Sequence, residues 1–226
     1  KLMKNVIVLI ACVIVAHLSY SQNSSTVDVD EKSYQTVKIG TQWWMAENLQ
    51  VLHFNNGDVI PKIKKGLLWK ELATPAYSYY DNKKKNKKRY GLLYNWYVVM
   101  DSRGVCPTGW HVSTDEDWSV LEKYLGMINN QVEGWNWRGS NQGIQLKSVG
   151  FEGSNTSGFS ALGTGYRDPN GKFSHLKEHN DYWTTTPYDN KGNTEGVLRG
   201  LTNELPTVVR NFHVPNYGFC VRCVKD

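Results

Sequence analysis

The segment His175–His179, with the sequence HLKEH, has the spacing of the zinc-binding residues in one class of peptidase. In such a site both histidines lie on one helix face, and the glutamate, here Glu178, acts as general base on a metal-bound water. The segment follows the turn-forming Asp168–Gly171 and has no apolar helical pattern to hold it. We therefore expect exposed loop histidines and no enzyme, with a zinc hydrolase as a remote alternative.

Cys220 and Cys223 are three residues apart in an alternating segment at the end of the sequence. If residues 217–225 form a strand, the two side chains face opposite sides, and their Cα atoms are about 10 Å apart. A disulfide needs a Cα separation of about 7 Å or less, and one tetrahedral zinc needs both sulfurs on the same side. A redox Cys-x-x-Cys pair begins a helix, and nothing in this segment begins one.

Cys223 shares its side of that strand with Phe219 and Val221, so we assign it to the core. Its expected partner is Cys106. Cys220 is then a leftover thiol.

Aromatic and charged side chains in two glycine-containing segments are candidates for ligand binding. An exposed ring beside a guanidinium or carboxylate is suited to stack on a sugar ring or to bind a peptide side chain. For the tryptophans, packing in the core is the favoured alternative. For the second segment, a turn with an internal ion pair is an equally good explanation. The candidates are Trp135, Trp137 and Arg138, and Tyr166, Arg167 and Asp168.

Asp168–Gly171, with the sequence DPNG, resembles part of a calcium-dependent sugar site. Such a site needs several converging oxygen ligands. The later segment Tyr182–Thr186 has no acidic residue, and Asp189–Asn193 offers too few ligands. We expect a plain turn, no metal and no cofactor; calcium is possible but has no support.

Residues 83–89 carry six positive charges in seven positions. We expect a solvated loop, because such a run cannot pack. Contact with an acidic polysaccharide or nucleic acid is the alternative, but no aromatic residue is interleaved, which argues against nucleic acid.

The first residues predict export. Lys4, the apolar run 6–16 and the small residues Ser19 and Ser21 indicate a signal peptide over residues 3–21. A lipobox-like stretch ending at Cys12 gives a lipoprotein alternative, which the continuing apolar run disfavours. The protein is then secreted, periplasmic or at the cell surface, without a transmembrane segment in the mature chain. Removal of Lys1 and Lys4 takes the net charge from +5 to +3, which is near neutral and implies no global polyanionic partner.

The elements that position these residues follow from periodicity and turn signals. Residues 22–33 read as a linker, and residues 34–49 as two strands around Gly40–Thr41. Residues 90–100 are a buried helix or strand, with length favouring a helix. The clearest helix spans 113–126, with a capping box from Ser113 to Glu116 and an apolar face of Trp118, Leu121 and Leu125. Further strands are expected at 159–166, 182–186, 196–202, 206–212 and 217–225.

Several segments in order resemble a known family: YQTVKIGTQWWMAENL, YGLLYNWY, VCPTGWHVSTDEDW, WRGSNQGIQLKS, GFSALGTGYRDPNGKF, YWTTT and GFCVRCVKD. They are similar to the Fibrobacter succinogenes major paralogous domain, common in exported proteins of Bacteroidetes-like bacteria, over residues 34–226. The resemblance implies an α+β, C-type-lectin-like fold with one or two helices, short twisted antiparallel strands and long loops. The family is distantly similar to formylglycine-generating enzymes.

A C-type lectin ties its first helix region to its last strand by a disulfide, which agrees with a Cys106–Cys223 bond. With those cysteines bonded, formylglycine-generating activity lacks its cysteine pair. The family usually has serine where this chain has Cys220, which supports an extra thiol and leaves open its use in an intermolecular bond.

The resulting hypothesis is an exported, non-enzymatic binding module for a glycan or a cell-surface protein, without nucleic acid as a partner. A structural component of the cell envelope without a small ligand is the alternative. Fold alone does not decide between them.

Overall fold

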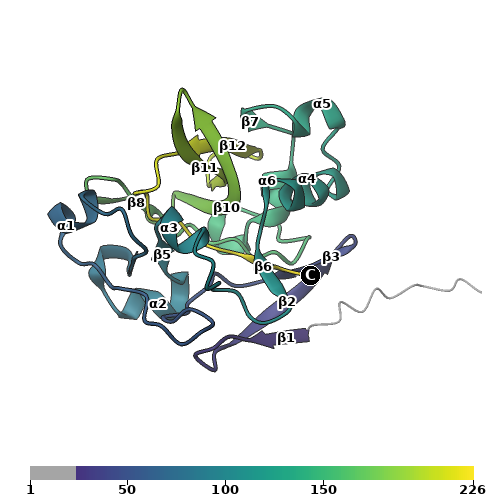
Figure 1. Ribbon diagram of the computed structural model, residues 1–226. Helices are drawn as coiled ribbons and strands as arrows, with labels where there is room; N and C mark the ends of the chain where they lie inside the picture. Colours follow the sequence, from purple (N-terminus) through teal and green to yellow (C-terminus); the bar gives the residue numbers. More distant parts are fainter. Residues whose placement is uncertain (1–23) are drawn as a thin grey trace, which may run out of the picture.

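Two antiparallel sheets organise the computed structural model, which describes residues 24–226 (Figure 1). The first has five strands in the order β1-β2-β3-β13-β6. Its C-terminal strand β13 therefore lies between a strand from the start of the domain and one from its middle. The strands are β1 Ser24–Val27, β2 Ser33–Ile39, β3 Gln42–Met45, β6 Trp110–Val112 and β13 Cys223–Lys225.

The expected hairpin within residues 34–49 is confirmed, with Gly40 in the turn at a φ of 62°. The expected linker is corrected in part, because Ser24–Val27 pair with Ser33–Thr36 as an edge strand. The expected signal peptide lies outside the described residues.

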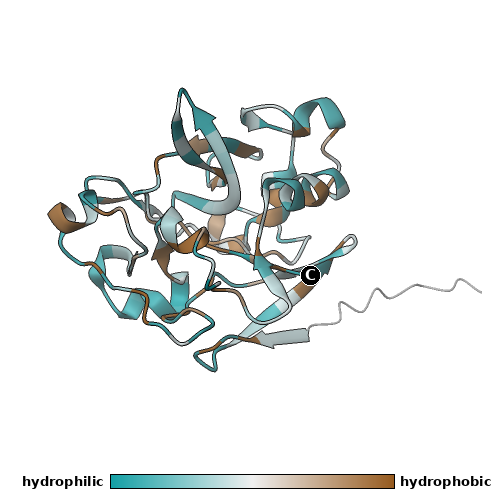
Figure 2. Cartoon of the chain, in the orientation of Figure 1, coloured by the Kyte–Doolittle hydropathy of each residue, from teal (hydrophilic) through white to brown (hydrophobic). Residues whose placement is uncertain are grey.

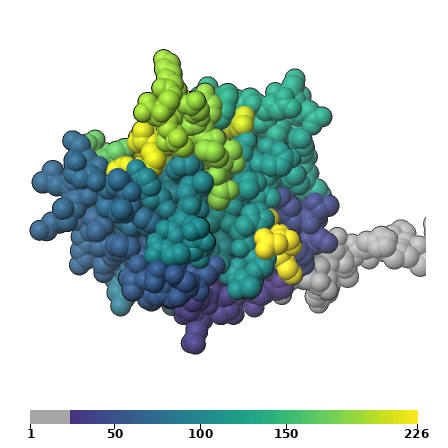
Figure 3. All heavy atoms as spheres, in the orientation of Figure 1, coloured from purple at the N-terminus to yellow at the C-terminus, as the bar shows by residue number. Residues whose placement is uncertain are grey.

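The second sheet has four strands in the order β10-β11-β12-β7 and carries the candidate site. Its long β10–β11 hairpin projects from the top of the molecule in Figures 1 and 3. The strands are β7 Asn136–Arg138, β10 His179–Asn190, β11 Asn193–Thr202 and β12 Val208–His213. Two small sheets pair β4 Tyr77–Ser78 with β5 Leu93–Tyr94, and β8 Tyr166–Arg167 with β9 Phe173–Ser174.

The strands expected at 182–186, 196–202 and 206–212 match β10, β11 and β12, while the one at 159–166 is wrong apart from Tyr166. Ser160 and Gly165 have φ values of 58° and 68°, which interrupt an extended chain. Of residues 217–225, only Cys223–Lys225 form a strand, and residues 218–220 make isolated bridges.

The six helices of the described residues are short except for α4, Asp115–Tyr124. Its capping box is formed by Thr114 and Asp117, one residue after the expected pair. Ser113 is buried and its Oγ accepts a hydrogen bond from Trp118 Nε1 at 3.0 Å. The others are α1 Gly66–Lys70, α2 Lys85–Tyr90, α3 Trp96–Val99, α5 Asn129–Val132 and α6 Gln142–Leu146, with single 3₁₀ turns at Tyr80–Asn82 and Val149–Phe151.

Two of these short helices correct the sequence interpretation. From Lys85 on, the lysine run forms α2 instead of a loop, because buried Tyr90 anchors one end while most of the charged side chains stay in solvent. Residues 90–100 contain both β5 and α3, so neither a single helix nor a single strand was right. No helix within residues 24–226 is long and apolar enough to cross a membrane.

Apolar side chains pack on both faces of the four-stranded sheet. On one face, Trp183 and Leu198 join a cluster with Phe219. On the other, Tyr182 and Val208 join a cluster with Trp118 and Leu121 of α4. The expected Cys106–Cys223 disulfide is present and spans 117 residues of sequence.

Buried ion pairs fasten α4 to the sheet. Glu122 accepts from Arg138 of β7 at 2.7 Å and from Arg199 of β11 at 2.9 Å. Asp115 accepts from Arg199 at 2.6 Å and from Arg210 of β12 at 2.7 Å. Charges this deep are tolerated only when they are paired, so this network fixes the sheet on which the candidate site is built.

Candidate functional site

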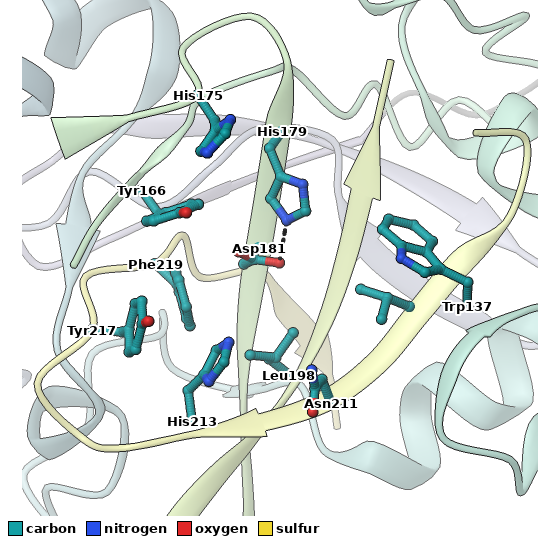
Figure 4. Close-up of a pocket in the computed structure, with 11 residues that line it drawn as sticks. Trp137, Tyr166, His175, His179, Asp181, Leu198, Asn211, His213, Tyr217 and Phe219 are labelled. Carbon is teal, nitrogen blue, oxygen red and sulfur yellow. Dashed lines mark hydrogen bonds and ion pairs between the residues drawn. The ribbon is translucent and has the colours of Figure 1, made fainter. Parts of the chain in front are cut away.

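A hollow of about 300 Å³ lies on the face of the four-stranded sheet away from α4. Figure 4 shows aromatic rings and polar side chains from β7, β10 and β12 converging on it, with further rings from β8 and the chain before β13. Its lining consists of Trp137, Tyr166, His175, His179, Asp181, Leu198, Val209, Asn211, His213, Tyr217 and Phe219.

Strand alternation selects which side chains reach the hollow. Successive side chains of a strand point to opposite faces of the sheet, so residues two apart share a face. His179 and Asp181 of β10 meet this rule, and so do Val209, Asn211 and His213 of β12. The intervening residues point toward α4.

Asp181 and His179 form a hydrogen-bonded pair at one side of the hollow. His179 Nε2 lies 2.9 Å from Asp181 Oδ1 (Figure 4). Burial lowers the pKa of His179, but the negative charge and hydrogen bond of Asp181 outweigh it, so the pKa is raised above 6.5. Gly200 on the neighbouring strand makes room for the pair, because a Cβ there would overlap Asp181 Oδ1 and crowd Val209.

His213 occupies the opposite side and behaves differently. Its ring stacks on Tyr217 with centroids 4.4 Å apart, and Tyr217 in turn stacks on Phe219 at 5.1 Å. Burial lowers the pKa of His213 below 6.5. The hollow therefore combines a histidine whose pKa is raised with one whose pKa is lowered.

A second hollow of about 340 Å³ continues the first. The two share Trp137, His175 and His179. The second is further lined by Glu178 and Glu204, with Thr202 and Leu205. The two hollows together form one groove, and the three shared side chains lie where they meet.

The HLKEH motif forms part of this groove, but not on a helix. Its middle residues form a turn that leads into β10, with His175 and Lys177 at φ values of 60° and 69°. His175 Nδ1 contacts Glu178 Oε2 at 3.1 Å. The helix on which a zinc peptidase mounts both histidines is missing here. Within residues 24–226 no three His, Cys, Asp or Glu side chains are placed to hold a metal ion.

The sequence model of the Fibrobacter succinogenes major domain matches residues 37–225. This chain belongs to that family. The match covers the five-stranded sheet from within β2 to β13, and the whole four-stranded sheet with its groove. No curated protein and no solved structure matches the chain.

Among the predicted binding residues of this Fibrobacter succinogenes major domain, Trp137 and Tyr166 line the groove. Trp135 does not, because it packs against Phe212 and under the guanidinium of Arg210, on the sheet face toward α4. The segment is also not a loop, since Asn136–Arg138 form β7. The two tryptophans are therefore separated by the sheet.

Both predicted arginines of the domain are buried and bound internally. Arg138 pairs with Glu122 beneath the sheet. Arg167 donates to the carbonyl oxygens of Ile63 at 2.6 Å and Lys64 at 2.9 Å, and its guanidinium lies over Trp69. This burial does not fit a ligand-binding role. Asp168 closes the β8–β9 turn, where its Oδ1 accepts from the backbone N–H of Lys172 at 2.8 Å.

The histidines also depart from expectation. His175 is exposed, as expected for a loop residue, but His179 is half-buried in the groove at the start of β10. Cys220 is a fully buried free thiol whose Sγ lies 3.2 Å from Asn48 Nδ2. An intermolecular bond through Cys220 is therefore excluded in the folded protein.

Sequence interpretation missed four polar or aromatic residues of the first hollow, Asp181, Asn211, His213 and Tyr217, and Thr202 and Glu204 of the second. The sequence contained a signal for two of these residues, Asn211 and His213. Asn211 and His213 are two apart in and beside the strand expected at 206–212, and so had to share a face. Nothing in the sequence indicated that this face meets the rings of Tyr166 and Tyr217.

Proposed function

We propose that this protein is an exported, non-enzymatic module that binds a glycan in the groove formed by the two hollows. The observation that carries the proposal is the grouping of aromatic surfaces around hydrogen-bonding tips. Trp137 exposes 39% of its surface beside the groove, and Tyr166 and Tyr217 border it from the other side. Sugar rings present apolar faces to stack on such rings and hydroxyls to bind polar tips.

The polar groups support a neutral or amino-bearing glycan. The carboxylates at the groove are Asp181, Glu178 and Glu204, and the ring of His179 lies next to Asp181. Acidic sugars are disfavoured because their carboxylates would face these groups. The continuity of the two hollows supports a chain of sugar units over a single ring.

The groove also offers a reason to prefer binding over a purely structural role. Most aromatic side chains of the domain are buried and serve the core. At the groove, however, Trp137 is exposed and Tyr166 and Tyr217 are half-buried, and the three gather on one face of the sheet. An envelope component without a ligand gives no account of this grouping.

A C-type-lectin-like architecture is part of the proposal. Its support is the pairing of the last strand, β13, with both β3 and β6, and the disulfide from Cys106 to that strand. A disulfide of this kind is typical of proteins outside the cytoplasm, which supports export.

The test is binding of the purified exported form, residues 22–226, to a broad panel of glycans, with calcium and with EDTA. The proposal predicts binding to neutral or amino-bearing oligosaccharides that EDTA leaves unchanged. Loss of binding in EDTA would establish a calcium-dependent site elsewhere. Absence of binding to the whole panel would favour the structural role, and zinc retained by the purified protein would revive the hydrolase.

A further inference from the structure

Positive charge in this protein is concentrated in one short part of the chain. Residues 61–90 contain ten basic and two acidic residues, a net of +8. The whole chain has a net charge of +5, so the remaining residues sum to −3. The basic residues are Lys62, Lys64, Lys65, Lys70, Lys83, Lys84, Lys85, Lys87, Lys88 and Arg89.

The two basic segments meet in space, although residues 71–82 separate them in the sequence. Asn82 Nδ2 donates to the carbonyl oxygen of Lys64 at 3.1 Å, which fixes the start of the α2 segment against the residues before α1. Figure 1 shows α1 at the left edge of the molecule and α2 lower and nearer the middle, both in the blue part of the chain that also forms the left side of Figure 3. We call this end, residues 62–70 and 83–89, the basic end.

Its charges are directed to solvent. All ten side chains belong to exposed residues except Lys87, which is half-buried. Within residues 24–226 the only ion pair that any of them makes is Lys83 with the exposed Asp81, at 3.1 Å. A surface with this many uncompensated cations attracts an extended anionic partner.

Two leucines project from the same end. Leu67 exposes 82% of its surface and Leu68 exposes 56%, and α1 stands out as an apolar tip at the left edge of Figure 2. Leu67 is the most exposed large apolar side chain of the described residues. Soluble polyanions such as nucleic acids or acidic polysaccharides have no apolar layer in which the two leucines could be buried. A bilayer has such a layer beneath its charged headgroups.

The tip is held firmly in this position. Trp69 is buried, and its Nε1 donates to the carbonyl oxygen of Asn216 at 2.7 Å. Asn216 Nδ2 in turn donates to the carbonyl oxygens of Lys70 at 3.0 Å and Leu72 at 2.8 Å. The exposure of the two leucines is therefore built into the fold.

We propose that the basic end docks on an anionic lipid bilayer, with Leu67 and Leu68 entering the interface and the surrounding lysines contacting lipid phosphates. Clusters of basic residues beside exposed apolar side chains are the sequence-readable pattern of such surfaces. This proposal is independent of the glycan groove.

The test is co-sedimentation of residues 22–226, which contain every described element, with lipid vesicles. Vesicles of phosphatidylcholine alone are compared with vesicles that contain roughly one-third phosphatidylglycerol. We expect binding to the anionic vesicles at least about tenfold stronger, falling steeply at high salt.

Two variants, each with a matched control, separate the contributions. Leu67→Ser with Leu68→Ser should weaken vesicle binding about tenfold, while Ile128→Ser with Val149→Ser, a pair exposed elsewhere, should not. Lys84→Glu, Lys87→Glu and Lys88→Glu together should abolish it. Lys123→Glu, Lys191→Glu and Lys225→Glu, with the same change of charge at other exposed positions, should retain most of it.

Equal binding to both kinds of vesicle, or binding to neither, would overturn the proposal. So would a leucine variant that binds anionic vesicles normally while soluble heparin competes fully, because the surface would then recognise charge alone. Trp137→Ala should leave vesicle binding unchanged, which keeps this test separate from that of the glycan groove.

Discussion

Trp135 and Trp137 are two residues apart but lie on opposite faces of the four-stranded sheet. Trp137 is the cross-strand neighbour of Val209 and shares the groove with it. Trp135 lies 4.0 Å under the guanidinium of Arg210, whose side chain points to α4. Between them Asn136 has a φ of 63°, which breaks the alternation. Their exposures, 37% and 39%, are nearly equal, so the pair forms a natural control.

The contact between His179 and Asp181 should set the pKa of His179. The pKa of His179 should lie above 6.5 in the folded protein and fall in Asp181→Asn, because the charge that raises it is removed. NMR titration of the histidine ring protons measures both values. His213 provides the internal comparison, since burial lowers its pKa below 6.5. An unchanged midpoint for His179 in the variant would contradict this account.

These shifts also set the pH dependence of stability. Because the folded pKa of His179 lies above 6.5, its contact stabilises the fold fully below pH 6.5 and is lost as pH rises through the raised value. His213 has the opposite sign: its contribution is present above pH 6.5 and is lost as pH falls through its lowered folded value. Compared with wild type, Asp181→Asn should lower the free energy of unfolding less at high pH than at low pH, as measured by denaturant unfolding across this range.

Glu122 should be among the most sensitive positions for stability. Glu122→Gln leaves the buried Arg138 without a carboxylate and leaves Arg199 with Asp115 alone. Breaking a buried pair in this way lowers the free energy of unfolding by about 3–5 kcal/mol. Glu116→Gln, an exposed change on the same helix, is the control and should stay within about 0.5 kcal/mol. Chemical denaturation measures both; similar losses would mean that the network is not stabilising.

The disulfide should stabilise the fold because it lowers the conformational entropy of the unfolded chain. It closes a loop of sequence separation 117, for which the chain-entropy model gives about 4–5 kcal/mol. Cys106→Ala with Cys223→Ala should lower the free energy of unfolding by a comparable amount, as measured by urea denaturation. If the free energy of unfolding of the wild-type protein is the same with and without reductant, this prediction is contradicted.

Cys220 should be unreactive until the protein unfolds. Burial raises the pKa of its thiol to about 12, so almost no thiolate forms near neutral pH, and the sulfur is out of contact with solvent. In the exported form, residues 22–226, a thiol reagent should label no cysteine of the native protein and one per chain in denaturant without reductant. Rapid labelling of the native protein would show that Cys220 is accessible.

Sequence alone predicted the parts of the fold that depend on local pattern. The hairpin of residues 34–49, the helix with Trp118 and Leu121 on its inner face, and the three strands of the second sheet follow from periodicity. The Cys106–Cys223 bond followed from alternation in the last segment. These features need no knowledge of which distant segments meet.

Arginines were the main failure, for a physical reason. Arg138, Arg167 and Arg222 each look like surface residues, yet each is buried by partners distant in sequence. Arg222, for example, donates to the carbonyl oxygens of Met45 at 2.7 Å and Phe159 at 2.8 Å. The tertiary arrangement determines such partners, and no local sequence pattern predicts them.

The groove was only half-predictable for the same reason. Trp137 and Tyr166 stood out as aromatic residues in polar surroundings. Asp181 and His213 did not, because they gain meaning only when β10 and β12 pair with β11 and present one face.

The glycan groove is tested most directly by measuring the glycan panel with three proteins side by side: wild type, Trp137→Ala and Trp135→Ala. We predict that wild type and Trp135→Ala bind the same oligosaccharides with similar affinity. Trp137→Ala should bind them at least about tenfold more weakly, as expected for loss of an aromatic platform. Equal affinity of Trp137→Ala and wild type, or weakening by Trp135→Ala alone, would contradict binding in this groove.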